Sequence, residues 1–125
     1  MSGRVVHFEV PYDNGERARD FYQKVFGWEM MSPPGMDYTL TMTGPNGDQG
    51  PTEPGFINGG MMARQNEMTS PIIVIQVDNI EAALKSIGEA GGRTLLERQT
   101  VGDMGYSAYF IDSEGNVIGL WETAQ

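Results

Sequence analysis

The sequence contains no cysteine and a single histidine, His7. The absence of cysteine excludes disulfides, thiolate nucleophiles, zinc fingers and iron–sulfur clusters, and a lone histidine excludes any site that needs two imidazoles from one chain. Basic residues are also scarce, because 8 Lys and Arg face 17 Asp and Glu for a net charge of −9. Since nucleic acids and anionic membranes attract basic surfaces, we expect neither of them as a partner.

Long hydrophobic runs are missing as well. The longest aliphatic run, residues 72–75, is far too short to span a bilayer, and the N-terminal segment lacks the apolar stretch of a secretory signal. A chain of 125 residues with 39% hydrophobic residues matches one globular domain over residues 1–125. The sequence therefore predicts a single cytoplasmic domain that can build its own core.

The chain contains an internal repeat. The pattern Asp-Asn-x-Glu-x-Ala begins at Asp13 and again at Asp78, and a glycine follows nine residues after each alanine, so the offset is 65. A second block recurs at an offset of 68, with Tyr38 and Gly47 in the first copy and Tyr106 and Gly115 in the second. Both matches in order predict two copies of one unit, module 1 at about residues 1–66 and module 2 at about residues 67–125.

Each copy is expected to form a strand, a helix and three further strands. Amphipathic spacing predicts helices over residues 18–26 and 80–87, and an aspartate with a glutamate three residues on, at Asp13 and Asp78, predicts the two helix starts. The expected strands are residues 4–10, 28–31, 37–43 and 56–64, then 71–77, 93–101, 106–112 and 117–123, with hairpin turns at 45–47 and 113–116. Residues 48–55 have no counterpart and are expected to form an extra loop. The sequence thus predicts an α+β fold of two tandem βαβββ modules.

Four segments of the chain together resemble a known superfamily. They read Val-His-Phe-Glu-Val-Pro at 6–11, Ala-Arg-Asp-Phe-Tyr at 18–22, Val-Phe-Gly-Trp at 25–28 and Tyr-Phe-Ile-Asp-Ser-Glu-Gly-Asn-Val-Ile-Gly-Leu-Trp at 109–121. This pattern resembles the vicinal oxygen chelate superfamily of glyoxalase I, bleomycin-resistance proteins and extradiol dioxygenases, and within it the predicted enzymes related to lactoylglutathione lyase. The resemblance implies two curved sheets around a cup that holds metal and substrate, and a homodimer.

The same resemblance places metal ligands on the first and last strand of each module. His7 stands at the first of these positions, but Ile72 and Gly119 stand at two others and cannot bind a metal. The last strand of module 1 offers no carboxylate over residues 57–62. Because a divalent ion normally takes three or four protein ligands, we expect the standard metal site to be lost and no cofactor to be required. A divalent metal held by His7, Glu9 and water is the alternative.

His7 and Glu9 are the candidate catalytic residues. They are two residues apart on one strand, so both side chains point to the same side and could form an acid–base pair. The alternatives are a hydrogen-bonded core histidine and a rim carboxylate in water. Glu122 is three residues past Gly119, so strand alternation turns it away from the Gly119 side and counts against it as a substitute ligand.

Aromatic, methionine and amide side chains are candidates for the ligand-binding lining of the cup. They are Tyr38, Met62, Gln76, Tyr106 and Trp121. Such a lining suits a flat apolar ligand, although the same residues could equally fill a core. The pair Gly59 and Gly60 in a strand is expected to mark a bend of the curved sheet.

These observations predict a protein that binds a small organic ligand in a cup, with His7 as its polar centre. One hypothesis is an enzyme of the glyoxalase or dioxygenase kind without the standard metal. A second is a non-catalytic protein that sequesters a drug or metabolite, as bleomycin-resistance proteins do. A third is a metal-dependent lyase or dioxygenase with non-standard ligands.

Overall fold

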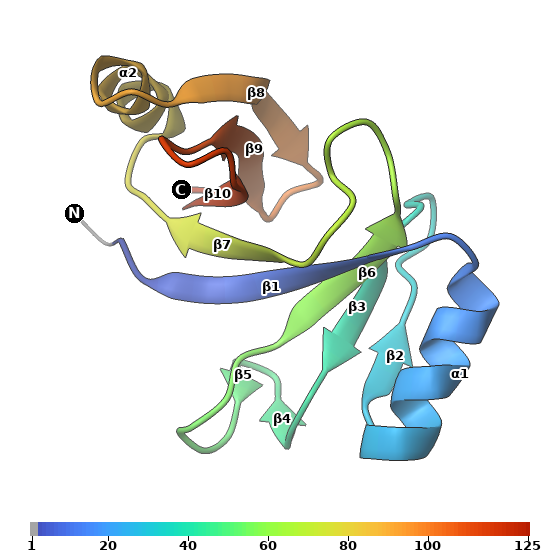
Figure 1. Cartoon of the computed structure of the whole chain (residues 1–125). Coiled ribbons are helices and arrows are strands. Elements are labelled where there is room, and N and C mark those ends of the chain that lie inside the picture. Colours follow the sequence, from blue (N-terminus) through green and yellow to red (C-terminus); the bar gives the residue numbers. More distant parts are fainter. Residues whose placement is uncertain (1–2) are drawn as a thin grey trace. The chain divides into compact units, whose positions relative to one another are not determined.

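The computed structural model describes residues 3–125 of the chain (Figure 1). These residues form two compact units, one of His7–Pro71 and one of residues 3–6 together with Ile72–Gln125. The first strand, β1 (Val5–Tyr12), begins in the second of these units and continues in the first.

The unit of His7–Pro71 holds one helix against a four-stranded sheet. Its elements are β1 from His7 on, α1 (Gly15–Phe26), β2 (Glu29–Met31), β3 (Thr39–Met42) and β6 (Gly59–Ala63). The strands lie in the order β2-β3-β6-β1, and only β6 and β1 among them run parallel. The expected extra loop contains a small hairpin of β4 (Asn46–Gly47) and β5 (Gly50–Pro51). The sequence predicted a hairpin turn at Asn46 and Gly47, but these residues form one strand of this small hairpin.

In both helices the capping residue lies one position after the aspartate that the sequence pattern predicts as the helix start. The N-caps are Asn14 and Asn79, and Asp13 and Asp78 precede them. The side-chain oxygen of Asn14 accepts the backbone N–H three residues on at 3.0 Å, and that of Asn79 does the same at 2.8 Å. An N-cap side chain reaches only the N–H groups two or three residues ahead, which fixes asparagine as the capping residue in both copies.

An aromatic cluster joins α1 to one face of its sheet. The Tyr22 ring on α1 stacks on Trp28 with centroids 4.6 Å apart, and Trp28 lies 5.7 Å from Phe8 on β1. Phe8 pairs in register with Gly59, where an added Cβ would come 2.5 Å from the Phe8 ring. His7 and Glu9 flank Phe8 in the strand, so they lie on the opposite face of the sheet, away from this cluster.

The second unit repeats the same order of elements. They are β7 (Ile72–Gln76), α2 (Ile80–Glu89), β8 (Arg93–Val101), β9 (Gly105–Ile111) and β10 (Val117–Thr123). The strands lie in the order β7-β10-β9-β8 (Figure 1), and residues 3–4 hydrogen-bond to both backbone groups of Gln76. The buried core against α2 consists of Ile80, Ala108, Phe110 and Leu120. The predicted α+β fold of two βαβββ modules is confirmed, with several strands a few residues shorter than expected.

The turn between β9 and β10 explains the most distinctive part of the C-terminal motif. Oδ1 of Asp112 accepts the backbone N–H groups of Glu114 at 2.8 Å and Asn116 at 2.9 Å. The Asn116 side chain donates to Oδ2 at 3.1 Å, and Gly115 takes a positive φ of 86°. These hydrogen bonds, those from Asn116 first, lower the pKa of Asp112. The Asp-x-x-Gly-Asn run therefore builds a hairpin turn.

Strand register defines which positions of the two modules are equivalent. Glu9 and Val74 match at the offset of 65, and each lies on the first strand of its module. Glu9 pairs with Gly60 on β6, and Val74 pairs with Gly119 on β10. Gly60 and Gly119 are therefore the same position in the two modules.

This equivalence corrects the second block of the predicted repeat. Gly60 pairs with Leu40 and Gly119 pairs with Tyr109. Leu40 and Tyr109 are therefore equivalent, and the offset between the two copies is 69 there and not 68. The counterpart of Tyr38 is then Ser107, not Tyr106. Because side chains alternate along a strand, an error of one residue moves Tyr106 to the opposite face.

Candidate functional site

Three polar side chains meet on the face of the first unit's sheet that lies away from α1. His7 and Glu9 reach this face from β1, and Tyr38 reaches it from the residue just before β3. The Tyr38 hydroxyl donates to Oε2 of Glu9 at 2.7 Å and lies 2.8 Å from Nε2 of His7. The hydroxyl therefore bridges the imidazole and the carboxylate.

Glu9 is buried, with only 5% of its surface exposed. The alternative of a rim carboxylate in water is therefore wrong. A carboxylate taken out of water needs hydrogen-bond donors, and the Tyr38 hydroxyl is one of them. The structure joins His7 to Glu9 through Tyr38, an arrangement that the spacing of the two residues on one strand did not predict.

Gly60 makes room for this bridge. A Cβ at Gly60 would overlap the hydroxyl and ring of Tyr38, so only glycine lets the tyrosine lie across β6. Gly59 similarly makes room for Phe8 on the other face. The glycine pair thus serves close approach of aromatic rings on both faces of the strand rather than the expected bend. Two adjacent glycines within a strand are the sequence signal that could have revealed the role of Tyr38, which was expected only as a lining residue.

Burial sets the charge state of the site. Desolvation lowers the pKa of His7 below its ordinary value of 6.5, and the negative charge of Glu9 partly opposes this by raising it. His7 is therefore a neutral imidazole at neutral pH. A neutral imidazole offers a lone pair and can accept a proton.

The other expected lining residues lie at different places in the two units. Met62 is buried on β6, two residues after Gly60 and on the same face. Gln76 and Trp121 are register partners on β7 and β10, and the indole N–H of Trp121 donates to Thr123 at 3.1 Å. Trp121 is two residues after Gly119, so these two residues and Gln76 share the sheet face that lies away from α2.

Tyr106 lies on the other face of that sheet. It packs against the core that α2 covers, and the Arg98 guanidinium lies 4.2 Å from its ring centroid. Its register partner is Glu122. The structure therefore separates Tyr106 from Gln76 and Trp121, with which the sequence had grouped it.

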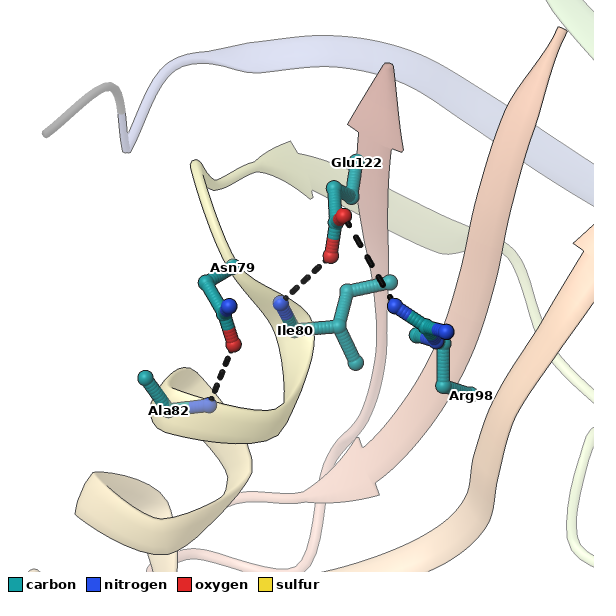
Figure 2. A network of polar contacts seen from close by, with 5 residues as sticks. All are labelled: Asn79, Ile80, Ala82, Arg98 and Glu122. Carbon is teal, nitrogen blue, oxygen red and sulfur yellow. Dashed lines mark hydrogen bonds and ion pairs between the residues drawn. The ribbon is translucent and has the colours of Figure 1, made fainter. Parts of the chain in front are cut away.

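The Glu122 carboxylate binds to the start of α2 and to Arg98 (Figure 2). Its Oε1 accepts the backbone N–H of Ile80 at 2.8 Å, and its Oε2 lies 3.8 Å from the Arg98 guanidinium. The first N–H groups of a helix have no partner within the helix, so this carboxylate completes the N-terminus that Asn79 caps. Glu122 points away from the Gly119 face, as its position in the strand predicts, and has a structural role.

The residues at the superfamily's metal positions do not fit a divalent ion. By register these positions are His7, Gly60, Ile72 and Gly119, so the side chains supply a single ligand atom. Within residues 3–125, no three His, Cys, Asp or Glu residues lie close enough together to hold a metal ion. The described part of the chain also contains no helix long and apolar enough to cross a membrane.

Comparison with known families and proteins gives consistent similarities. Residues 4–44 match the family described as bleomycin resistance protein-like N-terminal. A Didymella fabae protein named a glyoxylase-like domain-containing protein is 28% identical over 123 residues, which cover 93% of this chain and 91% of the relative. A Mycobacterium bovis protein, provisionally named glyoxylase CFP32, is 27% identical over 113 residues. That match covers 84% of this chain but only 40% of the relative, which is therefore much longer.

Solved structures show the same fold. Methylmalonyl-CoA epimerase from Mycobacterium tuberculosis superposes with a TM-score of 0.66 at 17% identity, covering 98% of this chain and 89% of the epimerase. A variant of the Streptomyces coelicolor methylmalonyl-CoA epimerase in complex with 2-nitronate-propionyl-CoA gives a TM-score of 0.64 at 16% identity, with 100% of both chains covered. At such low identity these structures establish the fold and leave the chemistry to the residues of this chain.

Proposed function

We propose that the chain is a member of the vicinal oxygen chelate superfamily, and that it binds a small carbonyl compound and moves a proton on it with His7 as the base. The observation that carries this proposal is the neutral imidazole of His7, linked through the Tyr38 hydroxyl to a buried carboxylate. A general base works best when its pKa lies near the working pH, because it is then largely unprotonated and still basic enough to take a proton.

The similar proteins suggest the class of substrate. The epimerase structures hold methylmalonyl-CoA or 2-nitronate-propionyl-CoA, and the sequence relatives carry glyoxylase names. Acyl thioesters and the hemithioacetals of 2-oxoaldehydes share one feature, a C–H bond next to a carbonyl group. Removal of that proton leaves an enolate, and we propose that His7 takes it. We also propose that the protein is cytoplasmic and forms a homodimer. Analytical ultracentrifugation tests the homodimer.

The experiment is proton exchange in D2O. Methylmalonyl-CoA and the hemithioacetal of methylglyoxal and glutathione are incubated with the purified protein, and deuterium at the carbon next to the carbonyl is followed by NMR. We expect incorporation with at least one probe, and a loss of about 10²–10⁴-fold in His7→Gln. Tyr22→Phe, on the α1 side of the sheet, is the matched control and should exchange at the unchanged rate. Exchange with neither probe, or full activity in His7→Gln, would overturn the proposal.

A second candidate function is sequestration of a drug. The match of residues 4–44 to the bleomycin resistance protein-like family favours it, and the net charge of −9 suits a cationic ligand. Titration calorimetry with bleomycin separates the two functions. Tight binding that His7→Ala leaves unchanged, without deuterium exchange on either carbonyl probe, would support sequestration over proton transfer.

A further inference from the structure

The hydrogen bonds around Tyr38 contain a limited number of protons. A tyrosine hydroxyl has one proton, and Tyr38 donates it to Oε2 of Glu9. The hydroxyl oxygen of Tyr38 also lies 2.8 Å from Nε2 of His7. The proton in that second hydrogen bond must therefore come from Nε2. A neutral imidazole carries one N–H, so Nδ1 is left with a free lone pair.

We propose that Tyr38 holds His7 as the Nε2–H tautomer and thereby makes Nδ1 the basic atom of the site. The assignment itself rests on the geometry of the three side chains. Its chemical consequence rests on the proposed function, because Nδ1 would then be the atom that takes the substrate proton. Tyr38 and Glu9 act through His7 and are positioning residues.

The backbone of the unit fixes this geometry. His7 and Glu9 are separated by one residue of β1, so their side chains leave the sheet in the same direction. Gly60 pairs with Glu9 on one side and with Leu40 on the other, and its missing side chain is the space that Tyr38 fills. The hydroxyl therefore cannot shift toward β6 or be replaced there by a side chain of that strand. This constraint orders the donor and acceptor before any ligand arrives.

The proton balance of the proposed step closes without another reactant. The C–H bond next to the substrate carbonyl breaks, its electron pair stays on the substrate as an enolate, and the proton moves to Nδ1. His7 becomes an imidazolium that still donates from Nε2 to Tyr38. The charge of Glu9, which already raises the pKa of His7, stabilises that cation. Return of the Nδ1 proton to carbon restores the neutral ring.

The lone histidine of the sequence permits a direct test. Protein grown with ¹⁵N-histidine gives ring signals from His7 alone, and long-range ¹H–¹⁵N spectra at a pH above 7.5 distinguish a protonated from an unprotonated ring nitrogen. We expect Nε2 to be protonated and Nδ1 to be unprotonated. Tyr38→Phe keeps the ring and removes the hydroxyl, so the ratio of tautomers should move by about tenfold toward Nδ1–H. Tyr22→Phe should leave the ratio unchanged.

The outcomes separate this inference from the proposed function. An Nδ1–H tautomer in the native protein, or a ratio that Tyr38→Phe does not change, would overturn the inference even where deuterium exchange is seen. The Nε2–H tautomer with the expected Tyr38→Phe response supports the inference even where neither carbonyl probe exchanges. Circular dichroism of Tyr38→Phe confirms that the variant is folded before its spectrum is compared.

Discussion

Replacing Gly60 with alanine is the perturbation that tests the arrangement of the site most directly. The added Cβ would occupy the space of the Tyr38 hydroxyl and ring, so the tyrosine must leave its position. The backbone at Gly60 does not have the positive φ that only glycine adopts easily. The collision with Tyr38, and not the backbone conformation, therefore determines the effect of the substitution.

The magnitude follows from the hydrogen bonds that the displaced Tyr38 would lose. Its bond to the buried carboxylate of Glu9 is charge-assisted and contributes about 1.5–3 kcal/mol, and its bond to His7 contributes about 0.5–1.5 kcal/mol. Alanine in place of a strand glycine stabilises the fold by about 0.5–1 kcal/mol, because the unfolded chain then loses less backbone entropy on folding. We therefore expect Gly60→Ala to lower the free energy of unfolding by about 2–3 kcal/mol, or Tm by about 10 °C.

Urea unfolding followed by tryptophan fluorescence measures this change, and a second background isolates its cause. In Tyr38→Ala the obstructing ring is gone, so adding Gly60→Ala should lower the free energy of unfolding by less than about 1 kcal/mol. Gly88→Ala is the matched control, because a Cβ there meets nothing within 4 Å on helix α2, and it should stabilise by about 0.5–1 kcal/mol. An equal loss from Gly60→Ala with and without Tyr38 would refute the reasoning.

Three further predictions concern the start of α2, the imidazole and the β9–β10 turn. Glu122→Ala leaves the N–H of Ile80 without its acceptor and should lower the free energy of unfolding in urea by about 1–2 kcal/mol, whereas Glu122→Gln keeps an acceptor and should change it by less than about 0.5 kcal/mol. The folded pKa of His7 is lowered, so the unfolded chain takes up a proton first as pH falls below about 6.5. Tm should therefore fall from about pH 7.5 to pH 5, and less steeply in His7→Gln. The folded pKa of Asp112 is also lowered, so the stability that its carboxylate contributes is present above about pH 4 and is lost below it. Asp112→Asn should therefore make Tm fall less steeply below about pH 4, and the same fall as in the native protein would contradict this.

Local patterns in the sequence predicted the order of the elements because each module repeats the same short-range signals. Alternation along residues 4–10 put His7 and Glu9 on one face, and the asparagine-led helix starts recur at an offset of 65. The capping residue itself was misplaced by one position, since Asp13 and Asn14 are both good N-cap types. Only the backbone geometry decides between two such neighbours.

The bridge at the site could not be read from local pattern because its parts are far apart in the chain. Tyr38 comes 29 residues after Glu9, and its hydroxyl donates to that buried carboxylate. The expected grouping of Tyr106 with Trp121 failed for a related reason. A repeat offset that is wrong by one residue reverses the face of every side chain in the strand, and no signal within residues 105–111 fixes the offset.

Register also shows how the two modules have diverged in chemistry while keeping one backbone. His7 and Glu9 correspond to Ile72 and Val74, so the polar pair of the first module is a buried aliphatic pair in the second. Both modules keep glycine at the equivalent position of the last strand, Gly60 and Gly119. In the first module that glycine makes room for a hydroxyl that bridges two titratable groups, and in the second an added Cβ would come 3.0 Å from a methyl group of Val74. Glycine supplies no metal-ligating side chain at either of these two positions. We therefore expect substitutions at Ile72 or Val74 to alter stability without altering the tautomer of His7, because the hydrogen bonds that set the tautomer join His7, Tyr38 and Glu9.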